Sequence, residues 1–373
     1  MSVTPNQIVL YGSANMPEAD GSTTGGALDL TKRVAFFDLT STGTVDVVSS
    51  SASDTATKIQ VMGRDASGTV VTPAAITLTG TTVIANAFSS QSFQRLLAAV
   101  ITGGSIAGLS NPTGTAAVGD VAVMQNTRTI SNHVAQVGSA NTSGVTPPLF
   151  KLQAGDGATV GALTYNGLGA IIRITSGTGS GQLRMISVPY AAGTYGTDIV
   201  AINRDWGTLP DATSHYDIAP GFLFDISPNP VTAITRLFTT AAADVPGGSS
   251  RTFYEKIFAL NTNSTTALTS AALQVLSESG ALPGSATLDL ALCKALNDTA
   301  TITNRQTLPA NGDTTALTFV TQPSAISVIA SPSSLPNGNA AADAQGMWLR
   351  LTLPAGTATY QGAADIRATG NTT

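Results

Sequence analysis

Glutamate and lysine, the residues that usually cover the exposed faces of helices, are almost absent from this chain. The sequence has 3 Glu and 5 Lys among 373 residues, against 54 Thr and 37 Gly. Thr, Val and Ile favour strands, whereas Gly and Asp favour turns. The composition therefore predicts an all-β protein with Gly/Thr-rich loops and few short helices, and it excludes a helical bundle.

Hydrophobic and polar residues alternate at period two along much of the chain, as they do in half-buried strands. Residues 59–63 and 69–72 flank a turn sequence that runs from Asp65 to Gly68, which predicts a hairpin. Residues 92–100 fit helical spacing, but the segment is only nine residues long, so a strand or a short turn explains it equally well.

Gly-, Pro- and Ser-rich segments near residues 101–114 and 219–230 interrupt the strand pattern. We therefore predict tandem β-sandwich or barrel-like domains of jelly-roll or immunoglobulin type, at residues 1–105, 106–222 and 223–373. The middle domain is expected to carry long loops. The Gly/Ala/Thr-rich stretches 12–27 and 137–163 are predicted to be arms along neighbouring subunits or surface loops.

The charge content limits the partners that the chain can have. Its formal net charge is −5, charged residues make up 10 % of it, and no cluster of basic residues occurs. Binding of nucleic acid by phosphate neutralisation is therefore not expected. No run reaches the ~18 apolar residues of a membrane span, and the N-terminus has no signal-peptide pattern, so we expect no membrane association and no export.

Residue types that carry chemistry are few and scattered. The single cysteine, Cys293, ends an apolar strand pattern and is predicted to be a core thiol without a disulfide partner. His133 and His215 lie 82 positions apart, so they form no zinc-type motif. His215 adjoins Tyr216 in a predicted strand, which favours a structural histidine over a general base.

The sequence Gly-Thr-Gly-Ser-Gly at residues 177–181 follows an apolar strand, as phosphate-binding loops do. Such a loop needs a helix N-terminus directly after it, but residues 182–188 have the pattern of a strand. We therefore predict a hairpin connection here. For the same reason Ser180, between two glycines, does not match a nucleophile elbow.

Four aspartates fall close together in sequence: Asp198, Asp205, Asp211 and Asp217. Asp205 precedes Trp206, an acid–aromatic pair of the kind found in sugar-binding clefts, so a glycosidase site is one interpretation. Asp is also the turn residue of this chain, which favours a turn role. We therefore predict no catalytic, cofactor-binding or metal site and no small-molecule substrate, so the protein is not expected to be an enzyme.

Several segments resemble the virion structural proteins of tailed bacteriophages. They are residues 8–17, residues 181–186, Trp206 with residues 210–218 (Pro-Asp-Ala-Thr-Ser-His-Tyr-Asp-Ile), and residues 253–258 and 346–351. The resemblance implies a capsid decoration (cement) protein, which binds the outside of the shell of major capsid protein and stabilises it. It also implies a place in the virion after assembly in the host cytoplasm, and it supplies no catalytic residue.

Two alternatives remain open at this point. The first is a tail, collar or fibre component that contacts the host surface. The second, less favoured because aromatic residues are only 5 % of the chain, is a carbohydrate-binding or carbohydrate-active β-sandwich protein. The low charge also predicts a homo-oligomer, a trimer or a dimer, because a weakly charged surface is suited to burial between subunits.

Overall fold

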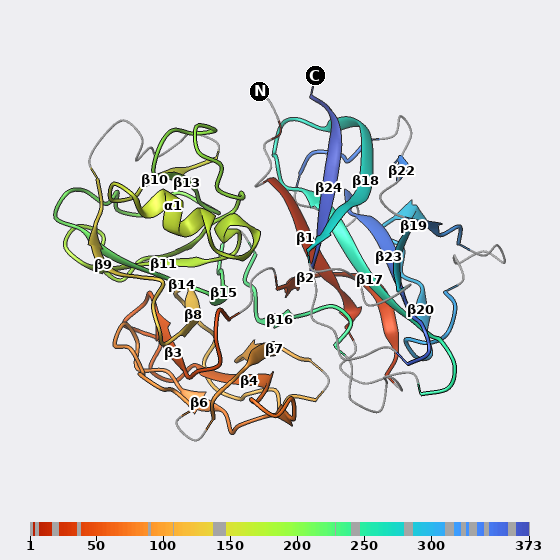
Figure 1. Cartoon of the computed structure of the whole chain (residues 1–373), viewed down its shortest axis with the longest axis horizontal. Helices are drawn as coiled ribbons and strands as arrows, with labels where there is room; N and C mark the ends of the chain where they lie inside the picture. The colour runs from red at the N-terminus through yellow and green to blue at the C-terminus, as the bar shows by residue number, and fades with distance from the viewer. Residues whose placement is uncertain are drawn as a thin grey trace. The chain divides into compact units, whose positions relative to one another are not determined.

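The computed structural model describes residues 3, 7–16, 22–35, 39–88, 91–106, 108–136, 147–227, 229–239, 247–279, 286–309, 317–321, 326–327, 334–338, 343–356 and 363–372. Nearly all of their regular secondary structure is strand, which confirms the prediction of an all-β chain of sandwich-like units (Figure 1). The chain divides into two compact units. Unit 1 comprises Met1–Val34, Ile106–Gly108 and Thr235–Thr373, and unit 2 comprises Ala35–Ser105 and Leu109–Ile234.

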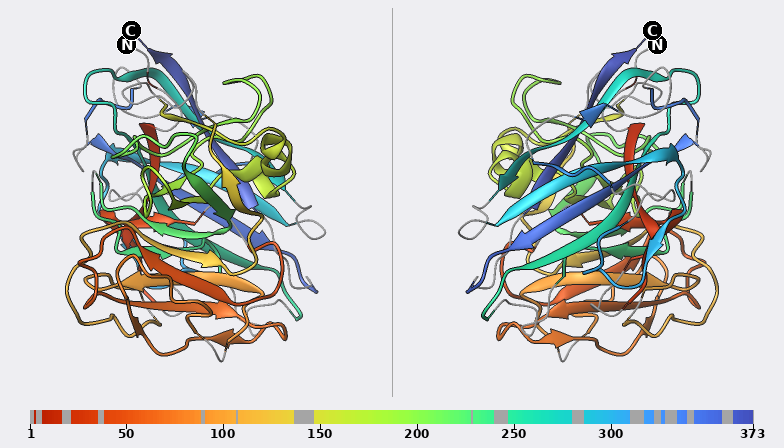
Figure 2. Two further views of the ribbon diagram at one scale, coloured as in Figure 1. Left: turned by 90° about the vertical axis from the view of Figure 1, so that its left-hand side faces the viewer. Right: turned by 90° about the vertical axis from the view of Figure 1, so that its right-hand side faces the viewer.

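Unit 1 contains two sheets. One has the order β21-β19-β23-β17-β1-β2 with β20 beside β2, and the other has the order β22-β18-β24. Figure 2 (right) shows β19, β23 and β17 side by side in cyan, blue and teal. The strands are β1 (Ile8–Asn15), β2 (Thr24–Val34), β17 (Arg251–Asn261), β18 (Leu268–Ser279), β19 (Thr287–Leu296), β20 (Thr301–Ile302), β21 (Val320–Thr321), β22 (Ile326–Ser327), β23 (Gln345–Leu353) and β24 (Ala363–Thr372).

The two sheets of unit 1 pack face to face through one hydrophobic core. Ile257 of β17 and Leu290 of β19 contribute to it from one sheet, and Leu273 of β18 contributes from the other. Side chains alternate between the faces of a strand, so the neighbours of Ile257 along β17 point the other way. There, Phe258 packs with Tyr11 of β1 in a second cluster. Strand β17 is thus buried on both faces.

Unit 2 contains four- and three-stranded sheets, a two-stranded sheet and the strands around β4. Its elements are β3 (Val45–Ser49), β4 (Lys58–Arg64), β5 (Val70–Val71), β6 (Ile76–Thr77), β7 (Arg95–Ile101), β8 (Val121–Gln125), β9 (Ile130–Val134), β10 (Leu149–Lys151), α1 (Asp156–Gly161), η2 (Thr164–Gly167), β11 (Ile171–Ser176), β12 (Leu183–Met185), β13 (Ile199–Ala201), β14 (His215–Ala219) and β15 (Gly221–Phe224). Strand β16 (Ala233–Thr235) spans the boundary with unit 1.

Unit 2 has two cores with a bridging cluster between them. The first core gathers residues of β3, β4, β7, β8 and β15, including Phe224, together with Phe93 just before β7. The second gathers residues of β9 to β14, with Phe150 and Trp206 at its centre. A smaller cluster that includes Met124 and Leu183 brings residues from both parts together. The two parts of unit 2 are therefore continuous in packing.

Helix, strand and turn were equally good interpretations of residues 92–100, and in the structure residues 95–100 lie in strand β7. The strand pairs with β4 from Ile59↔Ile101 to Arg64↔Arg95. Its residues from Leu96 to Ile101 are all buried. A surface helix would expose one of its faces to solvent, and this segment has no exposed face. The hairpin predicted around Asp65 and Gly68 is present as β4 and β5.

The N-terminal strands pack with the C-terminal part of the chain. Strand β1 pairs antiparallel with β17, from Ile8↔Asn261 to Gly12↔Ile257. The division into three domains stays a prediction. Residues 35–105 belong to unit 2, whereas this pairing places residues 8–34 in unit 1. It also corrects the interpretation of residues 12–27 as an arm or a loop, since residues 12–15 and 24–27 lie in β1 and β2. Of the second stretch, residues 137–146 lie outside the described residues.

None of the helices in the described ranges is long and apolar enough to cross a membrane.

Candidate functional site

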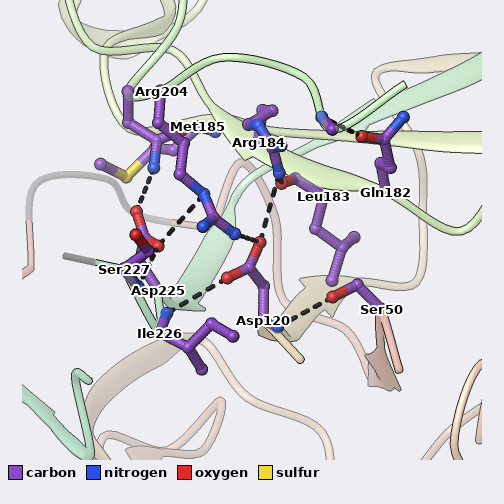
Figure 3. Close-up of polar contacts among 12 residues, drawn as sticks. Ser50, Asp120, Gln182, Leu183, Arg184, Met185, Arg204, Asp225, Ile226 and Ser227 are labelled. Atoms are coloured by element: carbon purple, nitrogen blue, oxygen red, sulfur yellow. Dashed lines mark hydrogen bonds and ion pairs between the residues drawn. The ribbon is translucent and has the colours of Figure 1, made fainter. Parts of the chain in front are cut away.

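Four charged side chains from distant parts of unit 2 meet in one place, which we call the Asp120 cluster: Asp120, Arg184, Arg204 and Asp225 (Figure 3). Asp120 lies directly before β8 and is 1 % exposed. Its Oδ2 lies 3.3 Å from Nη1 of Arg184 and also contacts Nη2 of Arg204. Its Oδ1 accepts the backbone N–H of Ile226 at 3.1 Å. Nε of Arg204 lies 3.3 Å from Oδ1 of Asp225, which follows β15.

Arg184 of β12 is enclosed by its neighbours. Its Nε and Nη2 donate to the carbonyl oxygen of Asp205 at 2.9 and 2.5 Å. The guanidinium carbon lies 5.1 Å from the centre of the Trp206 ring, within cation–π range. Burial and then the neighbouring charge of Arg204 lower the pKa of Arg184 to about 10, against the opposing effect of Asp120. The guanidinium is therefore still charged at neutral pH.

The Asp120 cluster is suited to joining parts of the protein rather than to binding a ligand. Its two carboxylates and two guanidiniums balance in charge. Asp120 and Asp225 flank strands of the first core, whereas Arg184 and Arg204 belong to the segment that forms the second core. Buried ion pairs of this kind stabilise the folded protein only when the remaining hydrogen-bonding groups of their side chains also have partners. Two such partners are backbone groups: the carbonyl of Asp205 accepts from Arg184, and the N–H of Ile226 donates to Asp120.

A second polar group, in which the half-buried His133 meets the buried Asp156 and Tyr216, has the geometry closest to a catalytic one. Nδ1 of His133 lies 2.8 and 3.0 Å from the two carboxylate oxygens of Asp156, at the start of α1. The hydroxyl of Tyr216 donates to the same carboxylate and accepts the backbone N–H of Gln153 at 2.8 Å. Burial, followed by the bond to Asp156, raises the pKa of Tyr216.

A histidine oriented by a buried carboxylate is one part of a hydrolytic triad, which also needs a nucleophile in reach of the second ring nitrogen. Among the described residues, the His133 ring contacts Asp156 and Tyr216 and no Ser, Thr or Cys hydroxyl or thiol. Tyr216 is held between Phe150 and His133, with ring centres 5.2 and 6.4 Å away. This arrangement fastens α1 to strands β9 and β14.

The structure does not pair the four aspartates named in the sequence analysis as catalytic carboxylates, since each has other partners. Asp198 is buried and accepts the backbone N–H groups of Gly155 and Gly157. Asp217 forms an ion pair with Arg128, with its Oδ2 3.5 Å from Nε of the arginine. The carboxylate of Asp211 accepts the N–H and hydroxyl of Thr213, and these bonds lower the pKa of Asp211, opposite to what a general acid requires.

The remaining residues singled out in the sequence have structural surroundings. Residues 177–181 connect β11 to β12 as a hairpin, and the hydroxyl of Ser180 donates to the carbonyl of Thr175. His215 lies in β14, with Nδ1 3.3 Å from the carbonyl of Asn132. Cys293 is fully buried in β19, and burial raises the pKa of its thiol to about 12, so it stays protonated near neutral pH.

Within the described ranges, no group of three or more His, Cys, Asp or Glu side chains could hold a metal ion. No protein-family model, curated protein or solved structure matches this chain.

Sequence reasoning missed both buried polar groups. Asp120 is 64 residues from Arg184 and 105 from Asp225, and Asp156 is 23 residues from His133. No local motif links such positions. One signal was available, because an Arg or Asp inside an otherwise apolar strand pattern must find a partner when the strand is buried. Arg184, in the run Leu183-Arg184-Met185-Ile186, is such a residue.

Proposed function

We propose that this chain is a structural virion protein that binds the outside of a tailed-bacteriophage capsid and stabilises it. The observation that carries the proposal is the inward placement of charge. Asp46, Asp120 and Asp289 are at most 5 % exposed, and each forms an ion pair inside the protein. Lys256 of β17 is fully buried with Nζ 2.5 Å from Oδ1 of Asp298.

With its charges paired inside, the chain leaves much of its surface to Thr, Ser, Ala and Gly. Covering a neutral surface with another protein avoids the desolvation of charged groups. A protein of this kind can bind the repeating surface of a capsid through a large contact area and many bound copies, and it needs no binding cleft. A standard interface takes about 800 Å² from each partner, and linked copies reinforce one another through effective concentration.

The contacts of the phage-like segments also support the proposal. Arg184 and Trp206, both in those segments, stack on each other, and Tyr216 bonds to Asp156 inside the second core. Residues of the pattern thus hold unit 2 together. The resemblance therefore lies in residues that determine the fold of unit 2.

The proposal is tested with capsids that lack this protein. Purified protein is expected to sediment with such capsids to a fixed number of copies, and to stay bound in about 1 M salt, where charges are screened within ~3 Å. Capsids that already carry the protein serve as the control and should bind no more. Binding that disappears at high salt would contradict the neutral-contact mechanism, and binding to tails alone would replace the proposal by the tail alternative.

A further inference from the structure

Strand β17, in the larger sheet of unit 1, carries a lysine whose side chain is completely buried, Lys256. Its Nζ lies 5.2 Å from the centre of the Phe258 ring and 5.6 Å from the centre of the Trp348 ring. Trp348 belongs to a hydrophobic cluster with Tyr254 and Cys293. Lysine is almost never fully buried without a partner, so the contacts of this amine show what the site is built for.

The partner of Lys256 is Asp298, in the segment between β19 and β20. Nζ lies 2.5 Å from Oδ1 of Asp298 and 2.6 Å from its backbone carbonyl oxygen, and the carbonyl oxygen of Ala300 lies 3.3 Å away. Oδ1 also accepts the N–H of Ala300 at 3.0 Å, which fixes the carboxyl group. Because Nζ touches Oδ1, the carboxyl carbon one bond further on is within reach of the amine.

We propose that Lys256 and Asp298 become joined by an amide (isopeptide) bond once the chain has folded. The ammonium first passes one proton to the carboxylate, which gives an amine and a carboxylic acid. Nζ then attacks Cγ of Asp298, the N–C bond forms, the C–OH bond breaks, and one water leaves. The reaction needs no oxidant, cofactor or second reactant, and it does not depend on capsid attachment.

The surroundings of the pair favour the amide over a lasting ion pair. Two charges in an apolar site are costly, whereas the amide carries none. The single N–H that remains on Nζ has the carbonyl oxygens of Asp298 and Ala300 as acceptors. The bond would close a loop of 42 residues and tie β17 to the segment that follows β19, as a disulfide would.

A proton donor lies beside the pair. Burial, opposed by the charge of Lys256 and supported by Asp298, raises the pKa of the Cys293 thiol to about 12. The thiol therefore stays protonated near neutral pH, and it can donate to the carboxyl group of Asp298 while the hydroxyl leaves.

Mass spectrometry of the denatured protein detects the bond directly. Loss of one water should make the intact chain about 18 Da lighter than its sequence requires. Trypsin does not cleave after an acylated lysine, so residues 252–294 should stay in one peptide that is joined to residues 295–305. An intact mass equal to that of the sequence would contradict the proposal. So would cleavage after Lys256 with the mass loss confined to a free peptide of residues 295–305, since that product is a cyclised Asp298.

Three variants identify the reacting groups. Asp298→Ala should have the full mass of its own sequence, and a loss of water that persists in it would contradict the proposal. Asp298→Asn offers a carboxamide to the amine and should give the same linked peptides with loss of ammonia, about 17 Da. Asp29→Ala is the matched control. Asp29 pairs with Lys32 at 3.5 Å, in a more exposed site, so this variant should still lose one water.

Discussion

Removal of residues 1–34 is expected to abolish the folding of unit 1 and to leave unit 2 folded. Strand β1 lies between β17 and β2 in the larger sheet of unit 1. The deletion removes both β1 and β2 and exposes one edge of β17. It also removes Tyr11, which is fully buried beside Phe258. Truncating one buried aromatic residue costs about 3–5 kcal/mol, and a whole domain is stable by about 5–15 kcal/mol.

Amide hydrogen exchange with peptide resolution measures this effect. In the shortened protein, β17 and β23 should lose protection, whereas β8 and β11 of unit 2 should keep it. A synthetic peptide of residues 1–34, added during refolding, should restore the protection of β17, and a scrambled peptide of the same composition should not. Full protection of β17 and β23 without residues 1–34 would show that β1 is dispensable.

Replacement of Asp120 by alanine is expected to destabilise unit 2 by about 3–5 kcal/mol. The change leaves the buried guanidinium of Arg184 without its carboxylate, and it leaves the N–H of Ile226 without an acceptor. Removing one partner of a buried ion pair costs this much because the other charge stays desolvated. Arg204 keeps its ion pair with Asp225, so the loss of stability should lie toward the lower end of this range.

Urea unfolding of Asp120→Ala can be followed in unit 2 alone. The chain has two tryptophans, Trp206 in unit 2 and Trp348 in unit 1. In a Trp348→Phe background, the fluorescence of Trp206 therefore reports on unit 2. Asp211→Ala is the control, because its carboxylate is not buried and accepts hydrogen bonds from Thr213 and Thr178, and it should destabilise unit 2 much less than Asp120→Ala. Equal losses in the two variants would contradict a clamping role of the Asp120 cluster.

The local part of this fold could be read from the sequence. Alternation at residues 59–63 and 69–72, with the turn at Asp65 and Gly68 between them, marked the hairpin of β4 and β5. These features depend on neighbours within a few residues. The pairing of β1 with β17 joins Ile8 to Asn261, and no local pattern specifies which distant strand a given strand will join.

The buried polar groups escaped prediction for a related reason. Asp120 directly precedes β8 and Asp156 begins α1, and both stand in Gly-Asp dipeptides of the kind that ordinary turns contain. Their burial depends on the two cores of unit 2 closing over them. By contrast, the predictions for Cys293 as a core thiol and for residues 177–181 as a hairpin needed only the local strand pattern, and both are confirmed.

The position of this protein in a virus particle is the most direct test of the proposed function. A cryo-electron microscopy reconstruction of purified particles, compared with particles from which the gene for this chain is deleted, should show the difference. We expect density lost from the outer surface of the capsid, repeated with the symmetry of the shell. Density lost only from the tail, or from no part of the particle, would contradict the account.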